Sequence, residues 1–109
     1  MEEVIYFNEL YDFYGCLLTD KQREYFENYY FNNLSLGEMA ENYGVSRNAI
    51  HKQLKITTDK LQYYEDNLKL RKKSLKLNQL LEDVKDEKLK KELMELFQTT
   101  KFILCCFIL

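Results

Sequence analysis

The sequence contains no proline and only three glycines among its 109 residues. Proline breaks helices because its ring removes a backbone donor and clashes with the preceding turn, so its absence leaves long helical runs uninterrupted. Leucine, lysine and glutamate, which lose little rotamer freedom in a helix, dominate the second half of the chain. A composition of 46% apolar and 31% charged residues excludes a collagen-like, linker-like or disordered chain. We therefore predict an all-α protein with one core.

Cysteine and histidine are also scarce. The three cysteines, Cys16, Cys105 and Cys106, do not have metal-ligand spacing, and His51 is the only histidine. The odd number of cysteines and the lack of a signal peptide predict reduced thiols and a cytoplasmic location. Neither a glycine-rich phosphate loop nor a nucleophile beside His51 is present. We expect no enzyme, no metal site and no cofactor.

No apolar run is long enough to cross a bilayer. The longest run, residues 102–109, has eight residues. As a helix it would be ~12 Å long, against a hydrocarbon layer of ~30 Å. Three interpretations of this tail stay open: it folds back on the aromatic helices, it ends as an exposed apolar terminus, or it is an anchor acylated at Cys105 or Cys106.

The net charge of −2 conceals an uneven distribution along the chain. Residues 1–20 carry five acids and no base. Residues 45–61 carry four bases against Asp59, and residues 62–78 carry five bases against two acids. A polyanion that binds this chain should therefore contact its middle third.

Helical periodicity and capping signals divide the first 45 residues. Apolar residues with i, i+3, i+4 and i+7 spacing form one face of a first helix, which we expect Gly15 to end in a left-handed conformation. Two capping boxes, Thr19 with Gln22 and Ser35 with Glu38, predict the starts of two further helices. The predicted helices cover about 3–14, 20–32 and 36–43.

A fourth helix is predicted to start at Arg47 and to continue as a long arm. Leu54, Leu61, Leu68 and Leu75 recur every seven residues. A coiled coil is one interpretation of this stripe, although the bases at residues 71–73 interrupt the seam. The alternative is a bent helix or helical hairpin, with the stripe packed on its own domain or on a second copy in a homodimer. We divide the chain into a helix-turn-helix domain, 1–60, and a C-terminal helical arm with the apolar tail, 61–109.

The segment LGEMAENYGVSRNAIHKQL, residues 36–54, has the pattern of a helix-turn-helix. Ala40 is small where two helices cross, and Gly44 permits the sharp turn between them. Val45 and Ile50 are expected to fill the angle between the helices, and Ser46 to cap the second one. In such a unit the first turns of the second helix enter the DNA major groove.

The expected DNA-facing residues share an outward position and a polar side chain that can reach bases or phosphates. A basic side chain can contact a guanine edge or neutralise phosphate, and an asparagine can pair with adenine. The alternative is that they are solvated polar residues and that the unit serves only protein contact. The candidate residues are Ser46, Arg47, Asn48, His51, Lys52 and Lys55.

The stretches LTDKQREYF, residues 18–26, and LSLGEMAENYGVSRNAI, residues 34–50, resemble the YlxM family of small bacterial helix-turn-helix proteins. The resemblance covers residues 4–97, and its helix-turn-helix is similar to region four of sigma factors. It implies an all-helical cytosolic protein, often encoded beside genes of the signal recognition particle and linked with that pathway. The sigma-like motif maps its DNA-facing positions onto Arg47, Asn48, His51 and Lys52.

Two features depart from the family pattern. An apolar residue usually stands three positions after Ile50, where this chain has Gln53, and Leu54 is expected to take its place one step later. The apolar tail at residues 102–109 differs from the polar ending expected of the family.

Two functions from different classes remain open. The first is a regulator that binds double-stranded DNA through the helix-turn-helix. The second is an adaptor that docks on the protein or the RNA of the signal recognition particle. The nine tyrosines also permit base stacking on single strands, but most occupy apolar faces of acidic helices, which favours core packing.

Overall fold

The computed structural model describes the backbone of residues 2–108 and the side chains of residues 2–98. Within that range the chain is helical and has no strand, which confirms the all-α prediction. A 3₁₀ turn, η1, follows the first helix, and a π-helical segment, η2, prolongs the second. The elements are α1 (Glu2–Tyr14), η1 (Gly15–Leu17), α2 (Asp20–Phe26), η2 (Glu27–Phe31), α3 (Leu36–Tyr43), α4 (Arg47–Leu68), α5 (Leu70–Glu82) and α6 (Glu87–Ile108).

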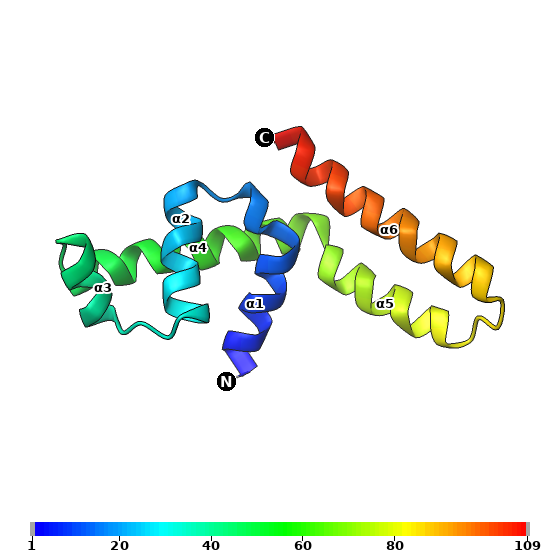
Figure 1. The fold of residues 1–109 in the computed structure, drawn as a ribbon, viewed down its shortest axis with the longest axis horizontal. Coiled ribbons are helices and arrows are strands. Elements are labelled where there is room, and N and C mark those ends of the chain that lie inside the picture. Colours follow the sequence, from blue (N-terminus) through cyan, green and yellow to red (C-terminus); the bar gives the residue numbers. More distant parts are fainter. Residues whose placement is uncertain (1, 109) are drawn as a thin grey trace.

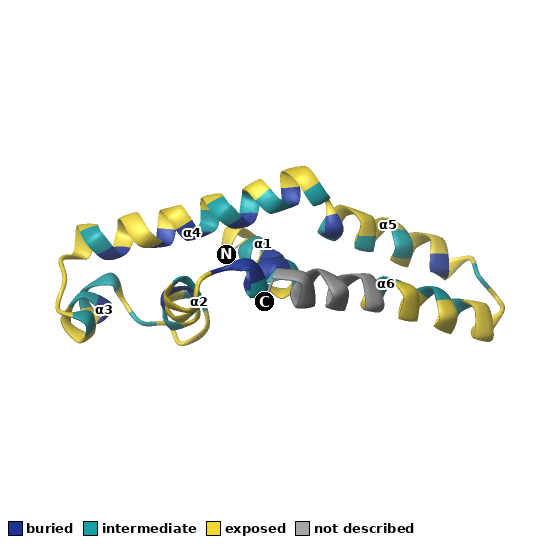
Figure 2. Cartoon of the chain, turned by 90° about the horizontal axis from the view of Figure 1, so that it is seen from above, coloured by how far each residue is buried: buried dark blue, intermediate teal, exposed yellow. Residues whose placement is uncertain are grey.

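The molecule is elongated because a helical hairpin projects from a small bundle (Figures 1 and 2). Helix α4 runs along the bundle and contacts α1, α2 and α3, while α5 and α6 form the hairpin at its far end. The principal extents are 55 × 31 × 22 Å, and the radius of gyration is 16.8 Å. A compact chain of this length would have a radius of about 13 Å.

Two apolar clusters hold the bundle together along α4. One surrounds Tyr14 and Phe26 from α1 and α2, with Leu61 of α4. The other joins Met39 of α3 to Ile50 and Leu54 of α4. Apolar burial of this kind is the main stabilising contribution to the fold.

The leucine stripe packs largely on its own domain. Leu54 and Leu61 are buried and Leu68 is half-buried, so these three turns of α4 are covered by the bundle. The chain then breaks at Lys69, whose φ is 55°, and Leu75 lies on a different helix with 48% of its surface exposed. Of the two interpretations of the stripe, the bent helix with a hairpin is therefore the one observed.

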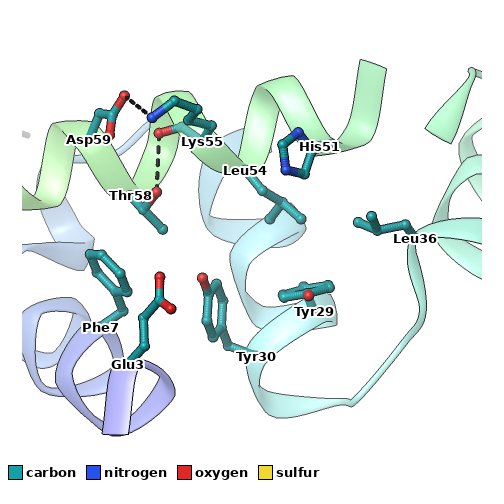
Figure 3. A pocket seen from close by; sticks show the side chains of 10 residues that line it. All are labelled: Glu3, Phe7, Tyr29, Tyr30, Leu36, His51, Leu54, Lys55, Thr58 and Asp59. Carbon is teal, nitrogen blue, oxygen red and sulfur yellow. Dashed lines mark hydrogen bonds and ion pairs between the residues drawn. The ribbon is translucent and has the colours of Figure 1, made fainter. Parts of the chain in front are cut away.

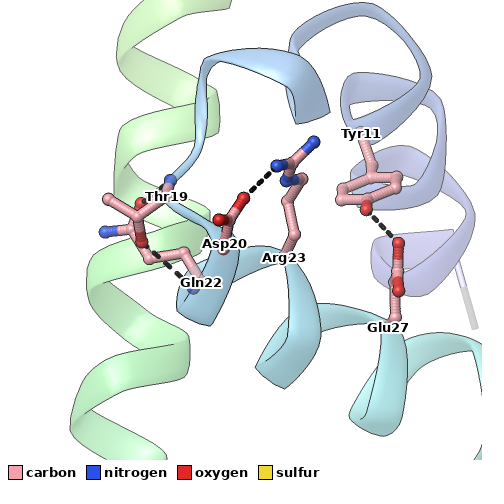
Figure 4. Close-up of polar contacts among 6 residues, drawn as sticks. All are labelled: Tyr11, Thr19, Asp20, Gln22, Arg23 and Glu27. Atoms are coloured by element: carbon pink, nitrogen blue, oxygen red, sulfur yellow. Dashed lines mark hydrogen bonds and ion pairs between the residues drawn. The ribbon is translucent and has the colours of Figure 1, made fainter.

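The predicted helix starts are confirmed. Thr19 Oγ1 accepts from the Gln22 amide at 3.1 Å, and the Gln22 side chain accepts from the Thr19 amide at 3.0 Å (Figure 4). The same reciprocal pair forms between Ser35 and Glu38. Each box satisfies backbone donors that the first helical turn leaves without partners.

The predicted role of Gly15 is wrong. Its φ is not positive, and the chain continues from α1 into η1 without a left-handed residue. A Cβ at Gly15 would lie 3.1 Å from the Tyr11 ring. Glycine fits here because the ring lies against the backbone, a contact that the local sequence does not reveal.

The break between α4 and α5 is held by buried polar groups of α1 and α4. Tyr14 Oη donates to Glu65 Oε1 at 2.6 Å and accepts from the Leu70 amide at 2.9 Å. The same Glu65 oxygen accepts from the Arg71 amide at 3.0 Å. Burial and the Glu65 hydrogen bond raise the pKa of Tyr14. These contacts satisfy amides at the start of α5 and so fix the direction of the hairpin.

Cys16, in η1, is half-buried against the cluster around Tyr14 and Phe26. Cys105, Cys106 and the other side chains of the apolar tail, 102–109, lie outside the described residues, so the three interpretations of that tail are not tested. None of the described helices combines the length and the apolar character of a membrane span.

Candidate nucleic-acid interface

Helices α3 and α4 form the predicted helix-turn-helix. Gly44 has φ 67° and ends α3, with the Gly44 and Val45 amides both donating to the Ala40 carbonyl oxygen. Ser46 then begins α4, and its Oγ accepts from the Ala49 amide at 3.1 Å. The left-handed turn costs glycine little because it has no Cβ.

On the packed face of the helix-turn-helix, Leu54 takes the place that Gln53 would occupy in the family pattern, as predicted. Ile50 is fully buried and Leu54 is 6% exposed, whereas Gln53 is exposed. Val45, which we expected to fill the angle between the helices, is instead 42% exposed, so that prediction is wrong. The partly buried residues that fill the angle around Ile50 are Leu34, Leu36, Ala40 and Tyr43.

Tyr43 anchors α3 to α2 and η2. Its hydroxyl donates to Glu24 Oε1 at 2.8 Å and accepts from Asn28 Nδ2 at 2.7 Å. Its ring centroid lies 4.5 Å from that of Tyr25. Burial, followed by the hydrogen bond to Glu24, raises the pKa of Tyr43 to about 12. This anchor fixes the angle at which α3 presents α4.

The candidate site residues lie together on the first turns of α4, and all six side chains are exposed. Lys52 and Asn48 project from the side of the helix opposite Ile50. Lys55 Nζ lies 3.4 Å from Asp59 Oδ2, a surface ion pair that reduces the positive charge available there. Among the described side chains, none forms an ion pair or side-chain hydrogen bond with Lys52 or Arg47.

Arg47 folds back over α3. A Cβ added to Gly37 would lie 2.9 Å from Arg47 Nη2 and 3.2 Å from Nε. The guanidinium therefore occupies the space that the missing side chain of Gly37 leaves. Sequence reasoning missed Gly37, although a glycine inside a short helix is a signal of close approach.

A cavity of about 360 Å³ opens beside the candidate interface, between α1, η2, α3 and α4 (Figure 3). His51 and Lys55 line its α4 side, and Tyr29 and Tyr30 line the opposite side. Glu3 also lines it, so an acid of the N-terminal helix faces the same space as His51. His51 and Lys55 therefore lie on a flank of mixed charge, whereas Lys52 faces open solvent.

Comparison with known proteins agrees with this geometry. The family model UPF0122, described as "Putative helix-turn-helix protein, YlxM / p13 like", matches residues 1–100. The chain belongs to the UPF0122 family. The UPF0122 protein of Caldanaerobacter subterraneus subsp. tengcongensis is 46% identical over 85 residues, which are 78% of this chain and 73% of the relative. The relative from Halalkalibacterium halodurans is 41% identical over 103 residues, covering 91% of this chain and 94% of its own. The resemblance stated from the sequence is confirmed.

The aromatic residues of this UPF0122 chain mostly pack inside the bundle. Tyr14 and Tyr25 are buried, and Tyr11 stacks on Phe26 with ring centroids 4.6 Å apart and planes 4° apart. The Tyr11 hydroxyl donates to Glu27, which ties α1 to η2 (Figure 4). Core packing therefore occupies most of the rings, while Tyr29, Phe31 and Tyr63 are exposed. Within the described residues, no group of three or more His, Cys, Asp or Glu side chains is placed to hold a metal ion.

Proposed function

We propose that this UPF0122 protein binds double-stranded DNA and regulates transcription in the cytoplasm, with the first turns of α4 in the major groove. The observation that carries the proposal is the exposed polar surface at the start of α4, presented by an intact helix-turn-helix. Such a unit places its second helix in the groove with the N-terminal residues toward the bases.

The proposed contacts differ in kind. Lys52 projects away from the packed side of α4 and neutralises backbone phosphate, while Asn48 on the same side pairs with an adenine edge. Arg47 leaves its position over Gly37 to reach a guanine edge or a phosphate. Ser46 caps α4 at the groove entrance, and the remaining candidates, His51 and Lys55, border the cavity and contact the flanking backbone.

Charge balance makes the proposed binding salt-sensitive. The chain has a net charge of −2, and its first 20 residues carry only acids. The acidic N-terminal helix therefore weakens the backbone contacts of His51 and Lys55 on the cavity flank, where Glu3 also lies. Favourable binding depends on the few free cations of α4, and each phosphate contact contributes about −0.9 to the slope of log affinity against log salt.

The hairpin favours a second candidate function, an adaptor for the signal recognition particle pathway. Its helices expose apolar side chains that the bundle does not cover, and exposed apolar groups mark protein-contact surfaces. The same surface is available for a homodimer, which would place two recognition helices on half-sites one duplex turn apart. In either case the helix-turn-helix domain, 1–60, carries the candidate contacts of α4, and the C-terminal arm, 61–109, carries the exposed apolar residues. The exposed residues are Leu75, Leu80, Leu89, Met94 and Leu96.

Fluorescence anisotropy with labelled duplex libraries at 50–200 mM salt tests the DNA proposal. Arg47→Ala with Lys52→Ala should weaken duplex binding and reduce the salt slope by up to about 1.8. Lys88→Ala with Lys91→Ala is the charge-matched control and should leave both values near wild type. Unchanged binding by the first pair refutes the proposal. A pull-down that recovers the protein or the RNA of the signal recognition particle equally well with the wild type and with the Arg47→Ala/Lys52→Ala variant would instead support the adaptor.

A further inference from the structure

Helix α5 carries a row of lysines that the helix-turn-helix does not use. Lys76 follows Lys72 and Lys73 by four and three residues, which places these three lysines on one side of α5, and Lys69 precedes them at the left-handed N-cap of the helix. All four are exposed. No acidic residue occurs between Asp66 and Glu82. We call these four residues the α5 lysine row.

The row does not contribute to packing of the hairpin. Helix α5 packs through the side that carries Leu70 and Leu81, which are buried, and Leu77, which is half-buried. The neighbouring Arg71 is used differently, because it pairs with Glu9 and lies 5.0 Å from the centroid of the Tyr6 ring. Among the described side chains, no ion pair or hydrogen bond holds any lysine of the row.

Electrostatic interactions within the protein are unfavourable for the lysines of the row. Lysines three and four residues apart on one helix face repel one another. The row also begins at the N-terminus of α5, where the helix dipole favours acids, yet the first turn of α5 has none. The carboxylates near this end already have partners. Glu65 is bonded to Tyr14 and to the Arg71 amide, Glu9 pairs with Arg71, and Asp66 accepts from Gln62. A local arrangement that disfavours the isolated fold is typical of a binding surface.

We propose that the α5 lysine row is a second contact to the phosphate backbone of duplex DNA, distinct from the contacts of α4. The proposal rests on the proposed DNA-binding function and extends it to the hairpin. The row covers ~10 Å of helix, and a duplex carries one charge per ~1.7 Å of its axis, so each of the four ammonium groups can meet a phosphate. Lysine suits this task because its charge is compact and lies on a flexible stem.

The spacing between the two contacts fits a duplex. Lys52 and Lys72 are 20 residues apart, and at 1.5 Å per residue they are separated by at most ~30 Å of helix. One turn of duplex is ~34 Å long. Figure 2 shows α4 and α5 as a bent ridge with exposed residues along its outer side and the other helices beneath it. The row therefore adds sequence-independent affinity about one turn from the bases that α4 reads.

The test is the salt dependence of binding of the full chain to a 30-base-pair duplex, measured by fluorescence anisotropy. The variant is Lys72→Gln/Lys73→Gln/Lys76→Gln, and Lys85→Gln/Lys88→Gln/Lys91→Gln is the control with the same loss of charge. We expect the row variant to lower the salt slope by about 1.8–2.7 and the affinity at 100 mM salt by at least about tenfold. The control should change both values much less, and Lys→Arg at the three row positions should preserve them. Far-UV circular dichroism checks that each variant keeps its helix content.

The outcomes separate the two proposals. An unchanged slope in the row variant, or an equal loss in the control, overturns the inference while leaving the α4 proposal to the Arg47 and Lys52 variants. A loss with the row variant but none with the Arg47 and Lys52 pair supports the row and refutes the α4 proposal. Binding of the row to a duplex RNA or to anionic lipid vesicles, with no effect on duplex DNA, overturns the inference.

Discussion

Replacement of Tyr14 by phenylalanine tests the polar contacts that set the direction of the hairpin. The substitution removes one hydroxyl from a fully buried side chain and leaves its ring in place. That hydroxyl donates to the buried carboxylate of Glu65 at 2.6 Å and accepts from the Leu70 amide at 2.9 Å. Two buried polar groups, one of them charged, lose a partner at the same time.

The expected cost follows from these two losses. A hydrogen bond to a charged group contributes about 1.5–3 kcal/mol, and a buried amide without a partner costs about 1–3 kcal/mol. Glu65 keeps the Arg71 amide as a donor, which places the total near the lower end of the combined range of about 2.5–6 kcal/mol. We expect Tyr14→Phe to lower the free energy of unfolding by about 3 kcal/mol, a large fraction of a typical 5–15 kcal/mol.

Urea unfolding followed by far-UV circular dichroism measures this change. Tyr63→Phe is the matched control, because Tyr63 is 64% exposed and no described hydrogen bond involves its hydroxyl. The control should change the free energy of unfolding by less than about 0.5 kcal/mol. In Tyr14→Phe the Leu70 and Arg71 amides should also exchange hydrogen faster. A loss below about 1 kcal/mol, or one equal to the control, would refute the assigned role of this hydroxyl.

Three further predictions concern the helix-turn-helix. Gly44→Ala should lower the free energy of unfolding by about 1–2 kcal/mol in urea titration, because a Cβ is disfavoured at φ 67°; no loss would show that the turn can change conformation. Gly37→Ala should raise the free energy of unfolding by about 0.5–1 kcal/mol through helix propensity. The new Cβ should also displace Arg47 and so change duplex affinity. A loss of stability would contradict this prediction. Because the pKa of Tyr43 is raised to about 12, the neutral hydroxyl is favoured in the folded state. The contribution of this hydroxyl to stability is complete below pH ~10 and is lost as the pH rises toward 12. Urea midpoints measured from pH 8 to 11 should therefore fall less steeply above pH 10 in Tyr43→Phe than in the wild type. An identical slope in the two proteins would contradict this role of Tyr43.

The sequence alone determined the features that depend on neighbouring residues. The capping boxes at Thr19 and Ser35, the left-handed Gly44 and the cap at Ser46 all use hydrogen bonds between residues three or four positions apart. The shift of the packing face from Gln53 to Leu54 follows from helical periodicity in the same way. Local chemistry therefore fixed the all-α class, the helix starts and the exposed position of the candidate residues.

Only the tertiary structure decided the remaining features, because their causes are distant in the sequence. The break at Lys69 is held by Tyr14, which lies 56 residues before the Leu70 amide that it accepts from. That His51 lines the same cavity as Glu3 depends on how α1 packs against α4. Arg47 turns over Gly37 because α3 and α4 meet at one angle. Such contacts form when separate helices bury their apolar faces together, and no pattern within a single helix specifies which side chains then meet.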